Sequence, residues 1–250
     1  MECKQWAVVV GSTGAMGAVI VRRLAAAGLR VLAVARDADA LASLVAATPG
    51  AVACPADIAD DAAIDAIRSH LDAPVRIAVH GPGVATAGGV LEAPPAALAE
   101  AVNIKAGGLL RLMRAVDERL QRGSRVVAIG GHYGFEPSAY AATAGVANAA
   151  LANLVRQLSW AYGERGITTH LLAPGPADTP RLHRVAEQRG ARAGLDAQAA
   201  MREMRAESAI GEFTTLEQVA WGIELLLAPE ADALAGSTLF MDAGRRKGMP

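Results

Sequence analysis

Short apolar runs alternate with longer segments of helical periodicity along this 250-residue chain. Such runs, bounded by turn residues, predict buried strands, whereas apolar positions recurring every three or four residues predict helices. The predicted strands cover residues 8–10, 31–35, 51–54, 75–79, 125–129, 168–173 and 237–241. The predicted helices cover residues 19–28, 37–47, 60–71, 95–122, 140–162 and 216–227. The alternation predicts an α/β fold in which a doubly wound parallel sheet carries helices on both faces. Because no linker or repeat interrupts it, residues 1–250 are predicted to form a single domain.

Glycines follow the first apolar run at intervals of three, in Val10-Gly11-Ser12-Thr13-Gly14-Ala15-Met16-Gly17. Gly11 permits a sharp turn, Gly14 lets the backbone approach a ligand, and Gly17 lets helix and strand pack closely. A helix N-terminus gathers unpaired N–H groups and a positive dipole end, so it favours a phosphate. An ordinary glycine-rich turn is the alternative. The flanking strand and helix favour a dinucleotide site, formed by Gly11, Ser12, Thr13, Gly14, Met16 and Gly17.

Residues at the ends of the next strands refine this prediction. An arginine after the second strand suits the 2′-phosphate of NADP, whereas an acid suits the 2′-hydroxyl of NAD. Arg36 therefore favours NADP, while the adjacent Asp37 leaves NAD open. Asp57, after the third strand, either caps the next helix or contacts the adenine. The fourth strand ends in His80-Gly81-Pro82-Gly83, whose small residues leave room for a ligand. Gly81 and Gly83 are candidate cofactor contacts, and His80 either braces the turn or contacts the cofactor.

Composition narrows the classes of function. A formal net charge of −1 gives no indication of binding to nucleic acid or an anionic membrane. No apolar run reaches the roughly 18 residues of a membrane span. The start of the chain predicts no signal peptide, because the first strand follows almost at once. Cys3 and Cys54 form no motif, so we expect reduced thiols in a cytoplasmic protein. No cluster of histidine and cysteine predicts a metal site.

Several segments, in order and spacing, resemble the short-chain dehydrogenase/reductase family. They are the glycine motif, Asp57-Ile58, Asn103, Tyr140, Pro174-Gly175-Pro176-Ala177-Asp178-Thr179, Glu217-Gln218-Val219-Ala220 and Asp242-Ala243-Gly244. The resemblance covers nearly the whole chain and implies a Rossmann-type fold, NADP as cofactor and a small-molecule substrate. It also implies a homo-oligomer, either a dimer or a tetramer.

The resemblance implies a role for each matching residue. Asp57 and Ile58 would contact the adenine. Tyr140 would give its proton to the substrate and contact the cofactor, with Asn103 as an active-site support. The cofactor's carboxamide end would be held by Pro174, Gly175 and Thr179.

Two positions depart from the family at its chemistry. Gly131 stands where the family has a serine, and Ala144 stands where it has a lysine, four residues after the tyrosine. Without a nearby cation, Tyr140 should keep a pKa of about 10 and remain protonated at pH 7. It would then donate a proton readily and accept one poorly, which favours reduction over oxidation.

The chain offers few replacements for these groups. Its lysines are Lys4, Lys105 and Lys247. Lys105 is two positions from Asn103, so on an α-helix it faces elsewhere, and we expect no lysine to substitute. His132 follows the fifth strand directly, and a histidine can donate to a substrate oxygen near neutral pH. His132 is therefore the candidate replacement donor.

These observations predict an NADP-dependent oxidoreductase that reduces a carbonyl or related small molecule, with Tyr140, Asn103 and His132 as the catalytic residues. Two alternatives remain open: a catalytically silent NADP-binding sensor or scaffold, and a non-redox lyase or isomerase. Residues 181–212 are polar and rich in arginine and alanine, and we expect them to form a mobile helical flap beside the substrate. They contain no motif that identifies the substrate.

Overall fold

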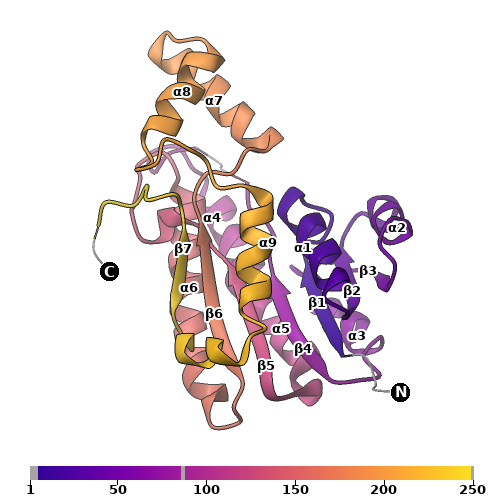
Figure 1. The fold of residues 1–250 in the computed structure, drawn as a ribbon. Helices are drawn as coiled ribbons and strands as arrows, with labels where there is room; N and C mark the ends of the chain where they lie inside the picture. The colour runs from indigo at the N-terminus through magenta and orange to yellow at the C-terminus, as the bar shows by residue number, and fades with distance from the viewer. Residues whose placement is uncertain (1–4, 86–87, 249–250) are drawn as a thin grey trace.

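The computed structural model describes residues 5–85 and 88–248. These residues form a seven-stranded parallel sheet in the order β3-β2-β1-β4-β5-β6-β7 (Figure 1). The strands are β1 (Trp6–Val10), β2 (Arg30–Ala35), β3 (Ala51–Pro55), β4 (Val75–His80), β5 (Leu120–Ile129), β6 (Thr168–Pro174) and β7 (Thr238–Met241). The chain reverses its direction of winding between β1 and β4, so the predicted doubly wound parallel sheet is confirmed.

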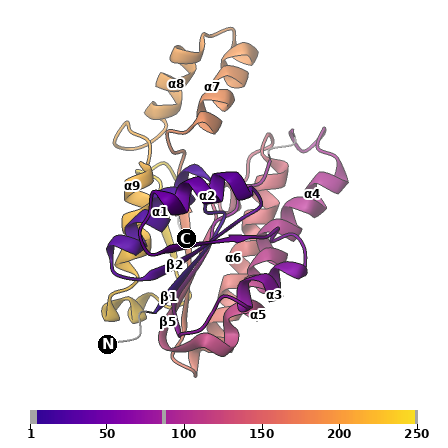
Figure 2. The same cartoon turned by 90° about the vertical axis from the view of Figure 1, so that its right-hand side faces the viewer.

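Helices cover both faces of this sheet, as Figure 2 shows from the side. One face carries α1 (Ala15–Ala26), α2 (Ala38–Ala46) and α9 (Leu216–Leu225). The other carries α3 (Ala62–Arg68), α5 (Gly108–Val116) and α6 (Ala142–Gly163), with α4 (Pro95–Val102) packed against α6. Because both faces are covered, the central strand β1 is apolar throughout, and all five of its residues are buried.

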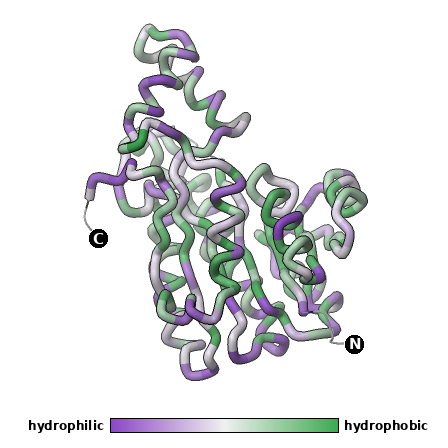
Figure 3. Tube along the Cα trace, in the orientation of Figure 1, coloured by the Kyte–Doolittle hydropathy of each residue, from purple (hydrophilic) through white to green (hydrophobic). Residues whose placement is uncertain are grey.

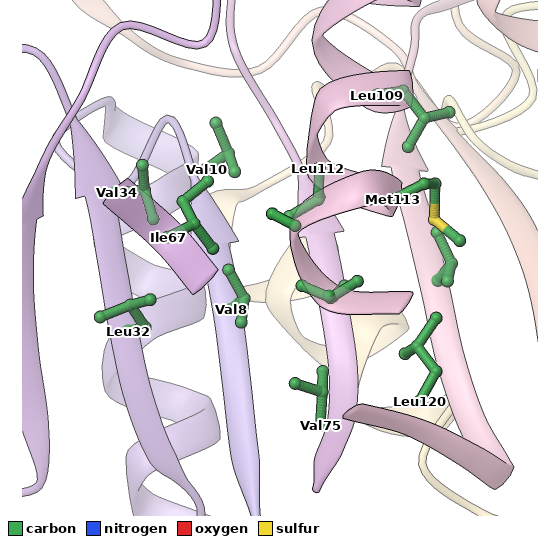
Figure 4. Close-up of a cluster of buried hydrophobic side chains, with 14 of the residues drawn as sticks. Val8, Val10, Leu32, Val34, Ile67, Val75, Leu109, Leu112, Met113 and Leu120 are labelled. Atoms are coloured by element: carbon green, nitrogen blue, oxygen red, sulfur yellow. The ribbon is translucent and has the colours of Figure 1, made fainter. Parts of the chain in front are cut away.

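The two faces hold separate hydrophobic cores. Figure 4 shows the core in which side chains of β1, β2 and β4 meet α3 and α5, including Val8, Leu32, Ile67 and Leu112. In Figure 3 the hydrophobic stretches gather along the central strands, while hydrophilic stretches mark loops and outer helix faces. None of the helices described is long and apolar enough to cross a membrane.

The helix predicted over residues 95–122 is wrong in two respects. It is interrupted after α4 by a π-helical turn, η1 (Asn103–Gly107), before α5 begins. It also ends early, because Leu120 already pairs with Val75 as the start of β5. The hydrophobic pattern cannot distinguish a longer helix from an early start of the strand, because a buried Leu120 fits both.

The segment predicted as a flap is helical. Helices α7 (Pro180–Ala193) and α8 (Ala197–Ala206) pack against each other around a small core of Leu182, Ala186, Ala200, Met204 and Phe213. Figure 1 shows this helix pair beyond one end of the sheet, where the strands finish. Its mobility stays a prediction.

Candidate active site

The turn between β1 and α1 leaves a helix N-terminus free of side-chain caps. Gly11 has φ of +82°, a conformation that favours glycine, and its N–H donates to the carbonyl of Val34 at 2.9 Å. Gly14 is the N-cap of α1, so no side chain caps the first turn, which also lacks an acidic residue. A Cβ on Gly17 would lie 2.2 Å from the Gly11 carbonyl oxygen. The turn therefore fits a phosphate at the exposed N–H groups of α1.

Two of the predicted cofactor residues near this turn have different surroundings. Ser12 is buried, and its hydroxyl donates to the Val34 carbonyl at 3.1 Å, so its side chain fastens the turn to β2. The side chain of Thr13 is partly exposed beside α1. Backbone N–H groups, rather than these side chains, therefore dominate the surface offered to an anion.

Arg36 and Asp57 lie side by side at the ends of β2 and β3. The Arg36 side chain is 76% exposed, and its Nη1 atom is 3.9 Å from Asp57 Oδ2. Asp57 accepts a hydrogen bond from the Ala59 N–H at 3.0 Å and does not cap α3. The helix-capping alternative for Asp57 is therefore wrong. Ile58 is buried in the core below them.

A cavity of about 910 Å³ opens at the carboxyl ends of the strands. Its walls come from the segments after β4, β5 and β6, the start of α6, helices α7 and α8, and the segment after β7. Of the predicted site residues, it is lined by Met16, Gly81, Gly83, His132, Tyr140, Pro174, Gly175 and Thr179. Open α/β sheets bind ligands at this edge, and the cavity is large enough for a small molecule.

His132, Tyr133 and Tyr140 form an aromatic group on the cavity wall. The rings of His132 and Tyr133 have centroids 3.9 Å apart, and Tyr133 meets Tyr140 edge to face at 5.5 Å. Burial, reinforced by the charge of Arg245, lowers the pKa of His132 to about 4, so its ring is neutral at pH 7. Burial raises the pKa of Tyr140, against the opposing charges of Arg245 and Arg189. Tyr140 is therefore protonated at pH 7 and can donate.

The structure does not bring Asn103 to the cavity. Its Nδ2 atom donates to the Ala59 carbonyl at 3.1 Å, and its Oδ1 atom accepts from Arg111 at 2.9 Å. Lys105 lines the cavity instead, with 5% of its surface exposed and its Nζ atom donating to the Ile129 carbonyl at 2.7 Å. The two side chains do face different ways, as helix geometry predicts. The expectation that no lysine substitutes assumed that Asn103 faces the site, and this assumption is wrong, because Asn103 points away and Lys105 lines the cavity.

His80 braces the end of β4. It is fully buried, and its Nε2–H donates to the Ile104 carbonyl at 3.1 Å. Burial and the nearby charge of Lys105 lower the pKa of His80 to about 3, so the ring stays neutral. Gly108 makes room for this ring, since a Cβ there would lie 2.8 Å from His80 Cε1. Of the two alternatives for His80, the structure places it in the bracing position, outside the cavity lining.

Sequence reasoning missed several cavity residues. Asn148 faces the cavity from α6, four residues after Ala144, which lines the cavity from the same helix face. Tyr140 lines the cavity from the turn before α6. The spacing of Asn148 from Ala144 was the signal present in the sequence. Glu207 pairs with Arg189 at 2.5 Å and also with Arg245. These ion pairs join α7, the end of α8 and the segment after β7, and no local sequence pattern predicts contacts between these elements.

The chain matches a family model described as enoyl-(acyl carrier protein) reductase over residues 10–246. It is 28% identical to the short-chain reductase protein NovJ of Streptomyces niveus over 251 residues, which cover 96% of this chain and 93% of NovJ. It is 30% identical to the cis-4-hydroxycyclohexanecarboxylate dehydrogenase of Sinomonas cyclohexanicum over 247 residues, or 95% of each chain. The crystal structure of BdcA in complex with NADPH is similar at a TM-score of 0.82 and 27% identity, covering 98% of this chain and 96% of BdcA. The chain therefore belongs to the short-chain dehydrogenase/reductase family, within the group that this model describes.

Proposed function

We propose that this protein is a cytoplasmic, NADP-dependent reductase of a carbonyl or related small molecule. The observation that carries the proposal is the placement of a protonated Tyr140 in a cavity at the strand ends, near the uncapped N-terminus of α1. NovJ is called a short-chain reductase, and BdcA binds NADPH in its crystal structure. The buried free thiol of Cys54 agrees with a reducing compartment.

The described residues suit the successive parts of an NADP molecule. The N–H groups at the start of α1 would hold the pyrophosphate, and the exposed guanidinium of Arg36 would meet the 2′-phosphate. Gly81 and Gly83 would leave room above β4, and Pro174, Gly175 and Thr179 would border the nicotinamide. When bound, NADPH would supply a hydride to the carbonyl carbon.

The remaining chemistry falls to the chain's own side chains. Tyr140 would donate its phenolic proton to the carbonyl oxygen and recover a proton from solvent, to which its side chain is partly exposed. His132 is neutral at pH 7, so it would act as a hydrogen-bonding group rather than as a cation. A tyrosine with a raised pKa is a poor base, and the reaction should run faster toward the alcohol than away from it.

Calorimetric titration with NADPH and NADH, followed by a panel of carbonyl compounds with absorbance at the nicotinamide band, tests this function. We expect NADPH to bind more tightly and its absorbance to fall with at least one carbonyl. Tyr140→Phe should lose that activity by about 10²–10⁴-fold. Tyr162→Phe is the matched control, because Tyr162 contacts Arg165 near the far end of α6. Failure of both nucleotides to bind would refute the proposal.

Gly131 and Ala144 line the cavity without a polar side chain, and this favours a second candidate, an NADP-binding sensor without turnover. The same titration separates the two, since a sensor would bind NADPH and oxidise none of it with any carbonyl. A lyase or isomerase would convert its substrate while the nicotinamide absorbance stayed constant.

We further propose that the protein forms a homo-oligomer through α5 and α6. Leu110, Val146 and Trp160 are 37%, 49% and 80% exposed on these helices. Exposed apolar side chains on adjoining helices are typical of a surface that another chain covers.

A further inference from the structure

A buried amide faces the cavity without a hydrogen-bond partner. Asn148 is 6% exposed, and its Oδ1 atom has no partner among the residues that the structure describes. A buried polar atom left unpaired is unfavourable, so such an atom in a cavity wall suggests a ligand that completes it. Rotating the amide by half a turn exchanges its oxygen and nitrogen, so Asn148 can offer a ligand either an acceptor or an N–H donor.

The amide of Asn148 occupies the space beside a residue that has no side chain. A Cβ on Gly131 would lie 3.0 Å from Asn148 Nδ2, which is closer than ordinary contact. Gly134 likewise lets α6 approach this turn, because its Cβ would meet the Asn148 backbone at 2.9 Å. Glycine at these two positions therefore admits Asn148 to the place where a side chain of residue 131 would otherwise lie.

A buried ammonium reaches the same turn from the other side. Lys105 comes from the π-helical turn η1 and donates to the carbonyl of Ile129, two residues before Gly131. Its charge is near enough to His80 to contribute to the lowered pKa of that ring. Asn148 and Lys105 thus converge from different elements on residues 129–131, and both line the cavity that holds Tyr140.

We propose that Asn148 binds the oxygen of the reacting carbonyl group and that Lys105 supplies the positive charge that stabilises this oxygen during reduction. The inference rests on the reductase function proposed above. As the carbonyl carbon gains a hydride from NADPH, its C=O π electrons move to oxygen, and the Tyr140 proton completes the alcohol. A hydrogen-bond donor and a cation that are already in place stabilise the developing negative charge at this stage. Positions 131 and 144 lack the polar side chains of the family, and Asn148 and Lys105 supply comparable groups from elsewhere.

Kinetics with NADPH and the carbonyl that the wild-type protein reduces best tests both residues. We expect Asn148→Leu to lower kcat/KM by about 10²–10³-fold, with the NADPH dissociation constant unchanged within threefold. Asn153→Leu, an exposed change on the same helix, should leave kcat/KM unchanged. Lys105→Met should lower kcat by about 10–100-fold, and Lys105→Arg should restore part of that loss, because it restores the charge.

A second measurement separates ligand binding from a structural role for Asn148. If the Asn148 amide serves a ligand rather than the fold, Asn148→Leu should raise the unfolding temperature of the free protein by about 2–4 °C, because it removes a buried polar atom that has no partner there. A fall in that temperature, or kcat/KM within threefold of wild type, would overturn the assignment of Asn148. Kinetics of Lys105→Met equal to those of wild type would overturn the assignment of Lys105.

A pair of substitutions tests whether residue 131 and Asn148 share one space. Gly131→Ser alone should lower activity, because the new Cβ crowds the Asn148 amide. The double variant Gly131→Ser/Asn148→Ala should recover activity above the level of Asn148→Ala. If the double variant is no more active than Asn148→Ala, a serine at position 131 does not replace the Asn148 amide. If the wild-type protein oxidises NADPH with no carbonyl, the reductase function fails and the inference fails with it. If the wild-type protein reduces a carbonyl and the variants reduce it at the same rate, the reductase function stands and only this inference is overturned.

Discussion

Replacing Gly17 by alanine tests whether the phosphate-binding turn depends on direct backbone contact. The added Cβ would lie 2.2 Å from the Gly11 carbonyl oxygen and 2.8 Å from the Ser12 Cα atom, whereas ordinary contact begins at 3.4 Å. Helix α1 and the turn must therefore separate by about 1 Å. Overpacking of this kind costs about 1–3 kcal/mol, partly offset by about 0.8–1 kcal/mol from alanine's better helix propensity. We expect a net loss of up to about 2 kcal/mol in the free energy of unfolding.

Urea unfolding and NADPH calorimetry measure the two consequences. The midpoint of unfolding should fall, and the NADPH dissociation constant should rise at least tenfold, because the N–H groups of α1 move relative to the turn. Gly163→Ala is the matched control: it also lies in a helix, and its Cβ would meet nothing within 4 Å. The control should be as stable as wild type or slightly more stable. Equal midpoints and equal NADPH affinities for the two variants would refute the close-packing argument.

Three further changes test other parts of the molecule. Burial lowers the pKa values of His80, His132 and His170 to about 3, 4 and 4, so the unfolded chain binds protons near pH 6.5 that the folded chain does not. Stability should therefore fall between pH 7 and pH 5 by about 2 kcal/mol for each histidine, and a urea midpoint constant over this range would contradict it. Arg36→Ala should weaken NADPH binding about tenfold and leave NADH binding unchanged in calorimetry; equal losses for both would exclude a 2′-phosphate contact. Trp160→Glu should convert the proposed oligomer to a monomer in light scattering, whereas a monomeric wild-type protein would remove the premise.

The parts of the site that the sequence predicts are those set by local geometry. The φ of Gly11 and the close contact at Gly17 follow from a strand that turns directly into a helix. Gly81 and Gly175 reach the cavity because the carboxyl ends of parallel strands meet at one edge of the sheet. The positions of Gly11 and Gly17 depend on neighbouring residues, and those of Gly81 and Gly175 depend on the parallel strands. Both features can be predicted from the sequence.

The parts that the sequence does not predict depend on contacts between distant elements. The helical spacing predicts that Asn103 and Lys105 face different ways, but it does not say which of them faces the cavity, and it does not reveal the π-helical turn at residues 103–107. Arg111 and the Ala59 carbonyl hold Asn103 away from the cavity, and Ala59 lies in a segment that the local pattern does not relate to Asn103. Asn148 could have been found, because it lies four residues after Ala144 on the same face of α6.

The substitutions that set this chain apart from its family are coupled by space as well as by chemistry. A Cβ at position 131 would lie 3.0 Å from Asn148 Nδ2, so a serine there would crowd the Asn148 amide and require it to shift. Ala144 lines the same cavity and packs beside Ile104, the neighbour of Lys105. Gly131 therefore leaves volume in the cavity wall that the Asn148 amide enters, and Lys105 reaches the same wall from η1. Burying an ammonium costs several kcal/mol unless its hydrogen bonds are satisfied, and the Ile129 carbonyl supplies one acceptor at 2.7 Å. The buried ammonium lies in the wall of the cavity that Tyr140 also lines, and this placement favours an enzyme over a silent binder.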